Sequence, residues 1–135
     1  MSVRGFDHWA ITVADIERTM AFYRGLFGSE ILYEDLWREG KIPIVSIRVG
    51  ANVINVHQAG SEAKPHAQHP TPGSADVCLR WDAPLSEAIA LLEANGIAVE
   101  EGPVPRPAAD GAVGRSVYFR DPDGNLLELL STVEE

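Results

Sequence analysis

The chain has 135 residues, 45% of them hydrophobic and 23% charged, and eleven basic against twenty acidic residues give a net charge of −9. This is the length of one ordinary domain and the composition of a soluble globular protein. The negative charge argues against nucleic acid as a partner, because a phosphate backbone is bound through lysine and arginine.

Two further absences narrow the protein class. There is no run of eighteen apolar residues, so we expect no membrane span. The single cysteine, Cys78, cannot form an internal disulfide, which favours a reducing, cytoplasmic setting.

The first half of the chain predicts a strand, a helix and three more strands. Hydrophobic residues alternate from Trp9 to Val13, which is typical of a half-buried strand and leaves His8 on its polar face. A helix capped by Asp15 follows, and Gly28 ends it. The further strands are expected over Glu30 to Asp35, Pro43 to Val49 and Val53 to Gln58.

The second half repeats this order after a linker. The stretch from Ala59 to Gly73 has three prolines, two glycines and no periodicity. Beyond it, Asp76 begins a strand as His8 does, and Pro84 suits the first turn of a helix. A longer loop that could act as a lid is predicted over Gly102 to Gly114. The remaining strands are expected over Ile97 to Glu101, Arg115 to Arg120 and Leu126 to Ser131.

The sequence therefore predicts a single α+β domain over residues 1–135 with two tandem βαβββ modules. Module one covers about 1–58, the linker 59–73 and module two about 74–135. Each module of about 60 residues is marginal alone. We therefore expect the two to form a curved mixed sheet around a metal site, within one chain or by exchange with a partner.

Four side chains with metal-binding donors fall at matching ends of the modules. Aligning the first strands places His8 opposite Asp76, and aligning the last strands places His57 opposite Glu128. A lone histidine in a strand is more often structural, but joint placement on polar strand faces favours one divalent cation. Imidazole with carboxylate suits Ni, Co, Zn, Mn or Fe, and nothing favours a closed structural zinc site.

Other polar residues on these faces are candidates for substrate binding. Asn55 shares a strand face with His57, and we expect Asn55, Arg80 and Tyr118 to contact the substrate. An anionic substrate could be held by arginine, but only Arg80 is predicted to share a strand face with Asp76. The other arginines considered are Arg106, Arg115 and Arg120.

Three further residues have metal-binding or reactive side chains but weaker support. His66 and His69 lie among prolines that exclude a regular helix, so we expect them to be loop residues. Cys78 shares the face of Asp76 and is expected to be a small buried filler rather than a reactive thiol.

Two stretches of the chain resemble the vicinal oxygen chelate superfamily, which includes glyoxalase I, extradiol dioxygenases, fosfomycin-resistance proteins and bleomycin-binding proteins. They are DHWAITVADIERTMAFYRGLFG, from Asp7 to Gly28, and VYFRDPDGNLLELL, from Val117 to Leu130. The linker and second half look most similar to the glyoxalase-domain-containing protein 5 group. The first strand lacks the basic residues with which bacterial glyoxalase I binds glutathione. The resemblance implies metal ligands at His8, His57, Asp76 and Glu128, the third of which is usually histidine in glyoxalase I and the dioxygenases.

The resemblance implies a lyase or isomerase of glyoxalase type for a small molecule with vicinal oxygens. The metal would chelate two adjacent substrate oxygens and stabilise an enediolate-like intermediate, with Glu128 or Asp76 as general base. One alternative is an Fe(II) extradiol-type dioxygenase that uses His8, His57 and Glu128. Another is a metal-free binding protein of the bleomycin-resistance kind. A homodimer is expected, because paired modules leave sheet edges open.

Overall fold

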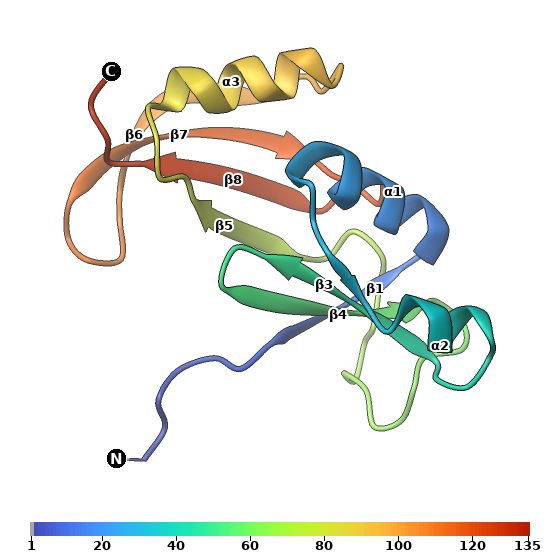
Figure 1. Ribbon diagram of the computed structural model, residues 1–135. Helices are drawn as coiled ribbons and strands as arrows, with labels where there is room; N and C mark the ends of the chain where they lie inside the picture. Colours follow the sequence, from blue (N-terminus) through green and yellow to red (C-terminus); the bar gives the residue numbers. More distant parts are fainter. Residues whose placement is uncertain (1) are drawn as a thin grey trace. The chain divides into compact units, whose positions relative to one another are not determined.

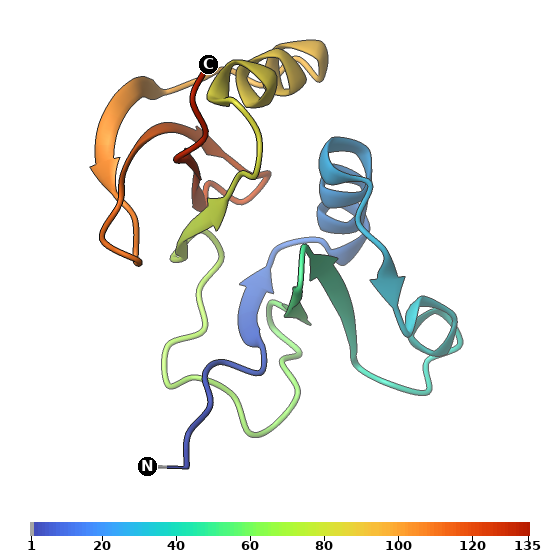
Figure 2. The same cartoon turned by 60° about the vertical axis from the view of Figure 1, so that its left-hand side comes forward.

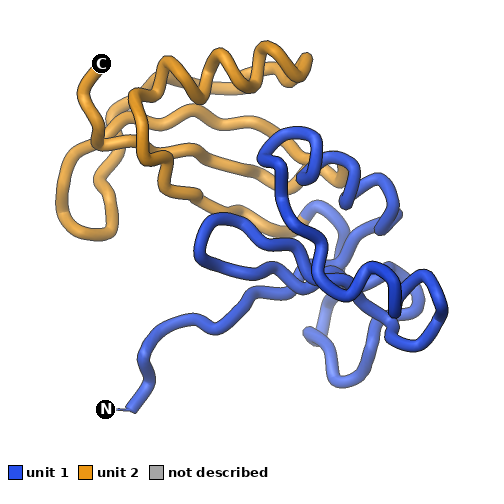
Figure 3. Tube along the Cα trace, in the orientation of Figure 1, with its two compact units in different colours: residues 1–73 blue, residues 74–135 orange. Residues whose placement is uncertain are grey.

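The structure, a computed structural model, describes residues 2–135, which form two compact units (Figure 3). Unit 1 ends at Gly73 and unit 2 begins at Ser74. Each contains a four-stranded mixed sheet and at least one helix (Figure 1), so the predicted α+β class with two tandem modules is confirmed. Within the described range, every helix is too short or too polar to cross a membrane.

Unit 1 has a mixed sheet with the strand order β1-β4-β3-β2, in which β1 runs parallel to β4. Helix α1 packs against β3 and β4, and the side chains of Ile16, Met20, Tyr23, Val45 and Val56 are buried there. The elements are β1 (Trp9–Val13), α1 (Ile16–Phe27), β2 (Ile31–Leu32), α2 (Glu34–Arg38), β3 (Ile44–Val49) and β4 (Asn52–Gln58).

The ends of α1 follow the sequence signals. The Asp15 carboxylate accepts hydrogen bonds from the backbone N–H groups of Glu17 and Arg18, at 3.0 and 3.4 Å. Gly28 ends the helix in the left-handed conformation, with φ of 63°. Both predicted helix boundaries are confirmed.

The strand expected over residues 30–35 is wrong in most of its length. Strand β2 holds only two residues, because Tyr33 adopts a left-handed φ of 66° and turns the chain into α2. An ion pair of 2.7 Å between Glu34 and Arg38, one helical turn apart, supports α2. The ion pair favours a helix in a segment whose first residues were predicted to be a strand.

Unit 2 repeats the arrangement with the strand order β5-β8-β7-β6, in which β5 runs parallel to β8. Helix α3 lies along one face of this sheet (Figures 1 and 2) and packs on β7 and β8. Leu85, Leu92, Val117, Phe119 and Leu127 are buried in this core. The elements are β5 (Asp76–Arg80), α3 (Leu85–Ala94), β6 (Glu101–Pro107), β7 (Val113–Arg120) and β8 (Leu126–Ser131).

The segment predicted to be a long loop is mostly strand. Residues 97–100 form no strand, β6 occupies residues 101–107, and only residues 108–112 connect it to β7. The misleading signals are Pro103, Pro105 and Pro107. An edge strand such as β6 tolerates proline, because N–H groups on its free side take no part in the ladder. The predicted lid is therefore replaced by a hairpin, and its prolines discourage a further strand from pairing there.

A buried polar cluster fixes the turn before β8. The Asp121 carboxylate accepts hydrogen bonds from the backbone and the side-chain N–H of Asn125, at 3.0 and 2.8 Å. The Asn125 side-chain oxygen accepts the backbone N–H of Ala75 at 2.9 Å, and the Ala75 carbonyl accepts the N–H of Leu126 at 3.0 Å. Both backbone groups of Ala75 are thus tied to the start of β8, which sets the position of Asp76.

We expect Asn125→Ala to destabilise the protein by about 2–3 kcal/mol, because it leaves buried partners without hydrogen bonds. Asn95→Ala is the matched control, since the exposed Asn95 side chain makes a single bond of 2.9 Å to the Leu91 carbonyl. Urea unfolding followed by circular dichroism measures both variants. Equal losses in the two variants would contradict the role given to the buried amide.

Candidate functional site

Each sheet turns one face toward its helix and bears the predicted site residues on the other. In β4 the buried Ile54 and Val56 alternate with Asn55 and His57, which are half-buried on the opposite face. His8 immediately precedes β1 and is exposed. We call the surface opposite the helix the open face of a unit.

The open face of unit 2 is more polar. On β5 the side chains of Asp76, Cys78 and Arg80 are exposed and alternate with half-buried hydrophobic residues. The prediction that Cys78 is buried is therefore wrong. Glu128 lies on β8 between Leu127 and Leu129, each about 1% exposed. These residues therefore lie on the strand face that the sequence predicted.

The strand register brings the two carboxylates of unit 2 to neighbouring positions. Cys78 is the partner of Glu128 in the parallel β5–β8 pair, and Asp76 lies two residues earlier on the same face. The two Cα atoms are therefore separated by roughly 7 Å along the strands and 5 Å across them. Carboxylates at this spacing can converge on one cation.

Unit 1 has the same two-residue offset between its paired parallel strands, but the residue that corresponds to Glu128 is Asn55 and not His57. Ala10 is the partner of Asn55 in the parallel β1–β4 pair, and His8 lies two residues before Ala10. Asn55 thus stands to His8 as Glu128 stands to Asp76. The expected equivalence of His57 and Glu128 is shifted by two residues, because backbone pairing and not side-chain type sets the alignment.

His57 lies farther along the sheet from His8. Its partner on β1 is Thr12, four residues beyond His8, which places the two histidines roughly 13 Å apart along the strands. Ligand nitrogens must come within about 2 Å of a bound metal, and this spacing disfavours a shared ion for the two histidines within unit 1. The His57 Nδ1 atom is buried and has no hydrogen-bond partner among residues 2–135.

Buried serines orient the polar residues at the two equivalent positions. The Ser116 hydroxyl donates to Glu128 Oε2 at 2.5 Å, and the Ser46 hydroxyl donates to Asn55 Oδ1 at 2.7 Å. Both serines are at most 3% exposed. Such bonds fix the orientation of a side chain before a ligand arrives.

The structure presents two candidate pairs, one in each unit. Within residues 2–135 it gathers no group of three or more histidine, cysteine, aspartate or glutamate side chains suited to a metal. His8 Nδ1 lies 2.8 Å from a carboxylate oxygen of the neighbouring Asp7, and both side chains are largely exposed.

The arginines on the open face of unit 2 differ in their partners. Arg80 donates to Thr132 at 2.8 Å and to Asp110 at 3.3 Å. Arg106 instead donates from Nε to the Tyr118 hydroxyl at 2.8 Å. Parity reasoning missed Arg106 because β6 was expected to be a loop.

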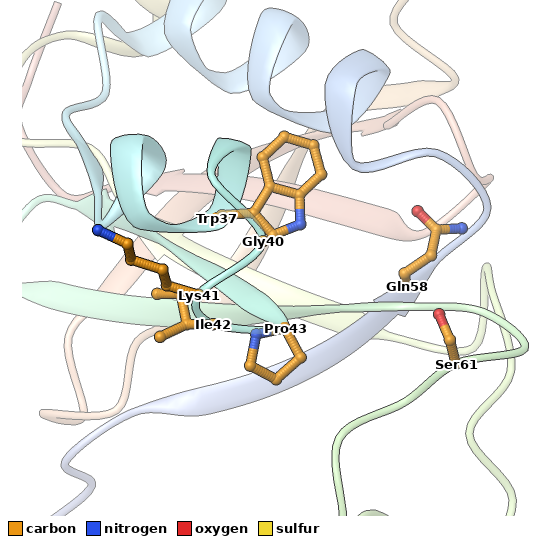
Figure 4. A pocket seen from close by; sticks show the side chains of 7 residues that line it. All are labelled: Trp37, Gly40, Lys41, Ile42, Pro43, Gln58 and Ser61. Atoms are coloured by element: carbon orange, nitrogen blue, oxygen red, sulfur yellow. The ribbon is translucent and has the colours of Figure 1, made fainter.

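Two other predicted features lie apart from these pairs. His66 and His69 are exposed in the linker, as expected for loop residues. Unit 1 also has a shallow pocket of about 420 Å³ that contains none of the predicted site residues (Figure 4). It is lined by Trp37, Gly40, Lys41, Ile42, Pro43, Gln58 and Ser61.

The Gln58 side of that pocket has a structural role. The Gln58 amide donates to the Ala14 carbonyl at 2.7 Å and accepts the Ile16 N–H at 3.2 Å. Gln58 therefore joins the end of β4 to the start of α1. The pocket does not contribute to the candidate site.

Comparison with known proteins gives consistent matches over nearly the whole chain. Residues 5–129 match the family model of the Glyoxalase/Bleomycin resistance protein/Dioxygenase superfamily. Virulence protein STM3117 of Salmonella typhimurium is 37% identical over 129 residues, which are 96% of this chain and 85% of that protein. Glyoxalase domain-containing protein RDO1 of Mycosarcoma maydis is 40% identical over 131 residues, which are 97% of this chain and 70% of that protein.

A solved structure agrees with these sequence matches. Integron cassette protein VCH_CASS1, from the mobile metagenome of V. cholerae, superposes with a TM-score of 0.87. It is 38% identical, and the match covers 98% of each chain.

The thiol of Cys78 reports on the charge of Glu128. Partial burial, then the charge and hydrogen bonding of Glu128, raise the pKa of Cys78 to about 11. We expect Glu128→Gln to lower this pKa and to raise the alkylation rate at pH 9 by roughly threefold or more in EDTA-treated protein.

Iodoacetamide alkylation measured from pH 8 to 11.5 follows this single cysteine directly. Glu87→Gln on the exposed side of α3 is the charge-matched control. An unchanged profile in Glu128→Gln would show that the carboxylate does not influence the thiol.

Proposed function

The chain belongs to the Glyoxalase/Bleomycin resistance protein/Dioxygenase superfamily, and on this premise we propose that it is a divalent-metal-dependent lyase or isomerase of glyoxalase type. Its substrate is a small molecule bound through two adjacent oxygens. The observation that carries the proposal is the repeated pair, His8 with Asn55 and Asp76 with Glu128, at the same register spacing in each unit.

The donor chemistry of the two pairs fits a divalent cation. Asp76 and Glu128 offer carboxylate oxygens, Asn55 an amide oxygen and His8 an imidazole nitrogen. Among Ni, Co, Zn, Mn and Fe, the oxygen donors of these pairs favour Mn²⁺. A cation held by such a pair would keep coordination positions for substrate oxygens, which it would polarise as a Lewis acid.

The hydrogen bonds of the open faces leave these ligands available. Asn55 Oδ1 accepts one bond from Ser46 and retains a second lone pair. Glu128 accepts from Ser116 through Oε2, which leaves Oε1 without that bond. In this proposal Glu128 or Asp76 also serves as the general base, because a carboxylate beside the substrate can take a carbon-bound proton.

The strand register favours this function over the dioxygenase alternative. That alternative needs two histidines and one carboxylate on iron, and the β1–β4 register separates His8 from His57. The serine-oriented Glu128 and Asn55 support a metal-binding protein over a metal-free binding module. The resemblance to the glyoxalase-domain-containing protein 5 group remains a prediction of the sequence.

The proposal includes a symmetric homodimer. Strands β1, β2 and β5 are at sheet edges, whereas the prolines of β6 disfavour pairing at the fourth edge. A second copy of the chain is the simplest cover for an open edge.

We expect the protein to bind Mn²⁺ through these pairs, with affinity reduced at least roughly tenfold in His8→Ala, Asn55→Ala and Glu128→Gln. His57→Ala should change the affinity by no more than about threefold, because His57 lies outside the repeated pair. Isothermal titration calorimetry gives the affinities, and inductively coupled plasma mass spectrometry gives the metal content.

His66→Ala is the matched histidine control, since His66 lies in the linker. Loss of binding in His57→Ala but not in Asn55→Ala would return His57 to the ligand set. An absence of binding for Mn²⁺, Fe²⁺, Co²⁺, Ni²⁺ and Zn²⁺ alike would contradict the metal-dependent function.

A further inference from the structure

We propose that Arg106, held in place by Tyr118, binds a carboxylate of the substrate, so that the substrate carries an anionic group in addition to its two chelating oxygens. This inference rests on the proposed function and identifies the chemical class of the substrate. The residues on which this inference depends, Arg106, Tyr118 and Glu128, all lie on the open face of unit 2.

The β6–β7–β8 pairing places this arginine beside Glu128. Tyr118 is the direct partner of Glu128 across β7 and β8, so the two side chains lie on the same face. Arg106 on β6 extends to the Tyr118 hydroxyl, to which its Nε donates at 2.8 Å. The guanidinium therefore lies one side chain away from the carboxylate assigned to metal binding and proton transfer.

The guanidinium is positioned before any ligand binds. Its Nη1 donates to the Pro105 carbonyl at 2.9 Å, and its Cζ lies 5.5 Å from the centroid of the Tyr118 ring. Pro105 and Pro107 flank Arg106, and Pro107 restricts the backbone of the preceding Arg106 to extended conformations. Ordering a long side chain in advance reduces the entropy lost on binding.

One end of the Arg106 guanidinium remains available for a ligand. Its Nη2 donates none of the hydrogen bonds formed by this side chain, and it forms a long ion pair of 4.0 Å with the Glu101 carboxylate. The side chain is 38% exposed. A guanidinium edge of this kind matches the geometry of a carboxylate.

Arg80 and Arg120 differ from Arg106 because each donates a hydrogen bond to a carboxylate. Arg120 donates from two nitrogens to the two carboxylate oxygens of Glu100, at 3.0 and 2.9 Å. Arg80 donates from Nη2 to Asp110 and to Thr132. Hydrogen bonding by Tyr118 raises the pKa of Arg106 above its already high ordinary value.

The test compares two acids that differ only in the second anionic group. 2-Hydroxyglutarate and 2-hydroxyvalerate share a five-carbon chain and a hydroxyl next to a carboxylate, but only the first has a carboxylate at the far end. With saturating Mn²⁺, we expect the wild-type protein to bind 2-hydroxyglutarate at least roughly tenfold more tightly, as measured by isothermal titration calorimetry.

Arg106→Gln should abolish this preference while leaving the affinity for 2-hydroxyvalerate unchanged. Arg106→Lys should retain part of it, because a lysine supplies charge without the planar fork. Tyr118→Phe should reduce it by roughly threefold, because the arginine loses its positioning bond. Arg24→Gln, on α1, is the charge-matched control, and thermal unfolding verifies that each variant is folded.

Each other outcome gives a distinct answer. Equal binding of the two acids by the wild-type protein overturns the carboxylate site and leaves the chelating function intact. A preference that survives in Arg106→Gln but is lost in Arg80→Gln overturns the assignment to Arg106. Binding of neither acid overturns the chelating function and, with it, this inference.

Discussion

The parallel pairing of the first and last strands of each unit is the constraint on which the candidate site depends. Side chains alternate along a strand, so a slip of one residue would turn Asp76 or Glu128 toward the helix. In unit 2 the buried Asn125 prevents that slip by binding the backbone of Ala75, directly before β5. The polar cluster that stabilises the turn therefore also sets the spacing of the two carboxylates.

In each sheet the hydrophobic core residues lie on one face and the candidate site residues on the other. Leu127 and Leu129 contribute to the core beneath α3, whereas Glu128 between them lies on the open face. The buried hydroxyl of Ser116 then orients the carboxylate. A rigid sheet with buried polar supports can hold ligands in a binding geometry without a mobile loop.

The open face of unit 2 carries a positively charged side chain although the chain as a whole is negatively charged. The protein carries a net charge of −9, yet Arg106 presents a cationic edge with no carboxylate within hydrogen-bond distance. The prolines of β6 stiffen the strand that carries this arginine and disfavour pairing at the sheet edge. The same residues thus limit association at this edge and position a binding group.

Alternation and capping signals by themselves determined much of this protein: the tandem repeat, the limits of α1, and the faces on which His8, Asp76 and Glu128 lie. The limits of α1 and the strand faces were predictable because they depend on neighbours within a few residues, and the repeat because both halves share one residue pattern. Tertiary structure decided the edge strand β6, the availability of Arg106 and the equivalence of Asn55 with Glu128. Each of these depends on which backbone pairs with which across long stretches of sequence, and the register of such pairing is set by the packing of the whole sheet and not by local residue patterns.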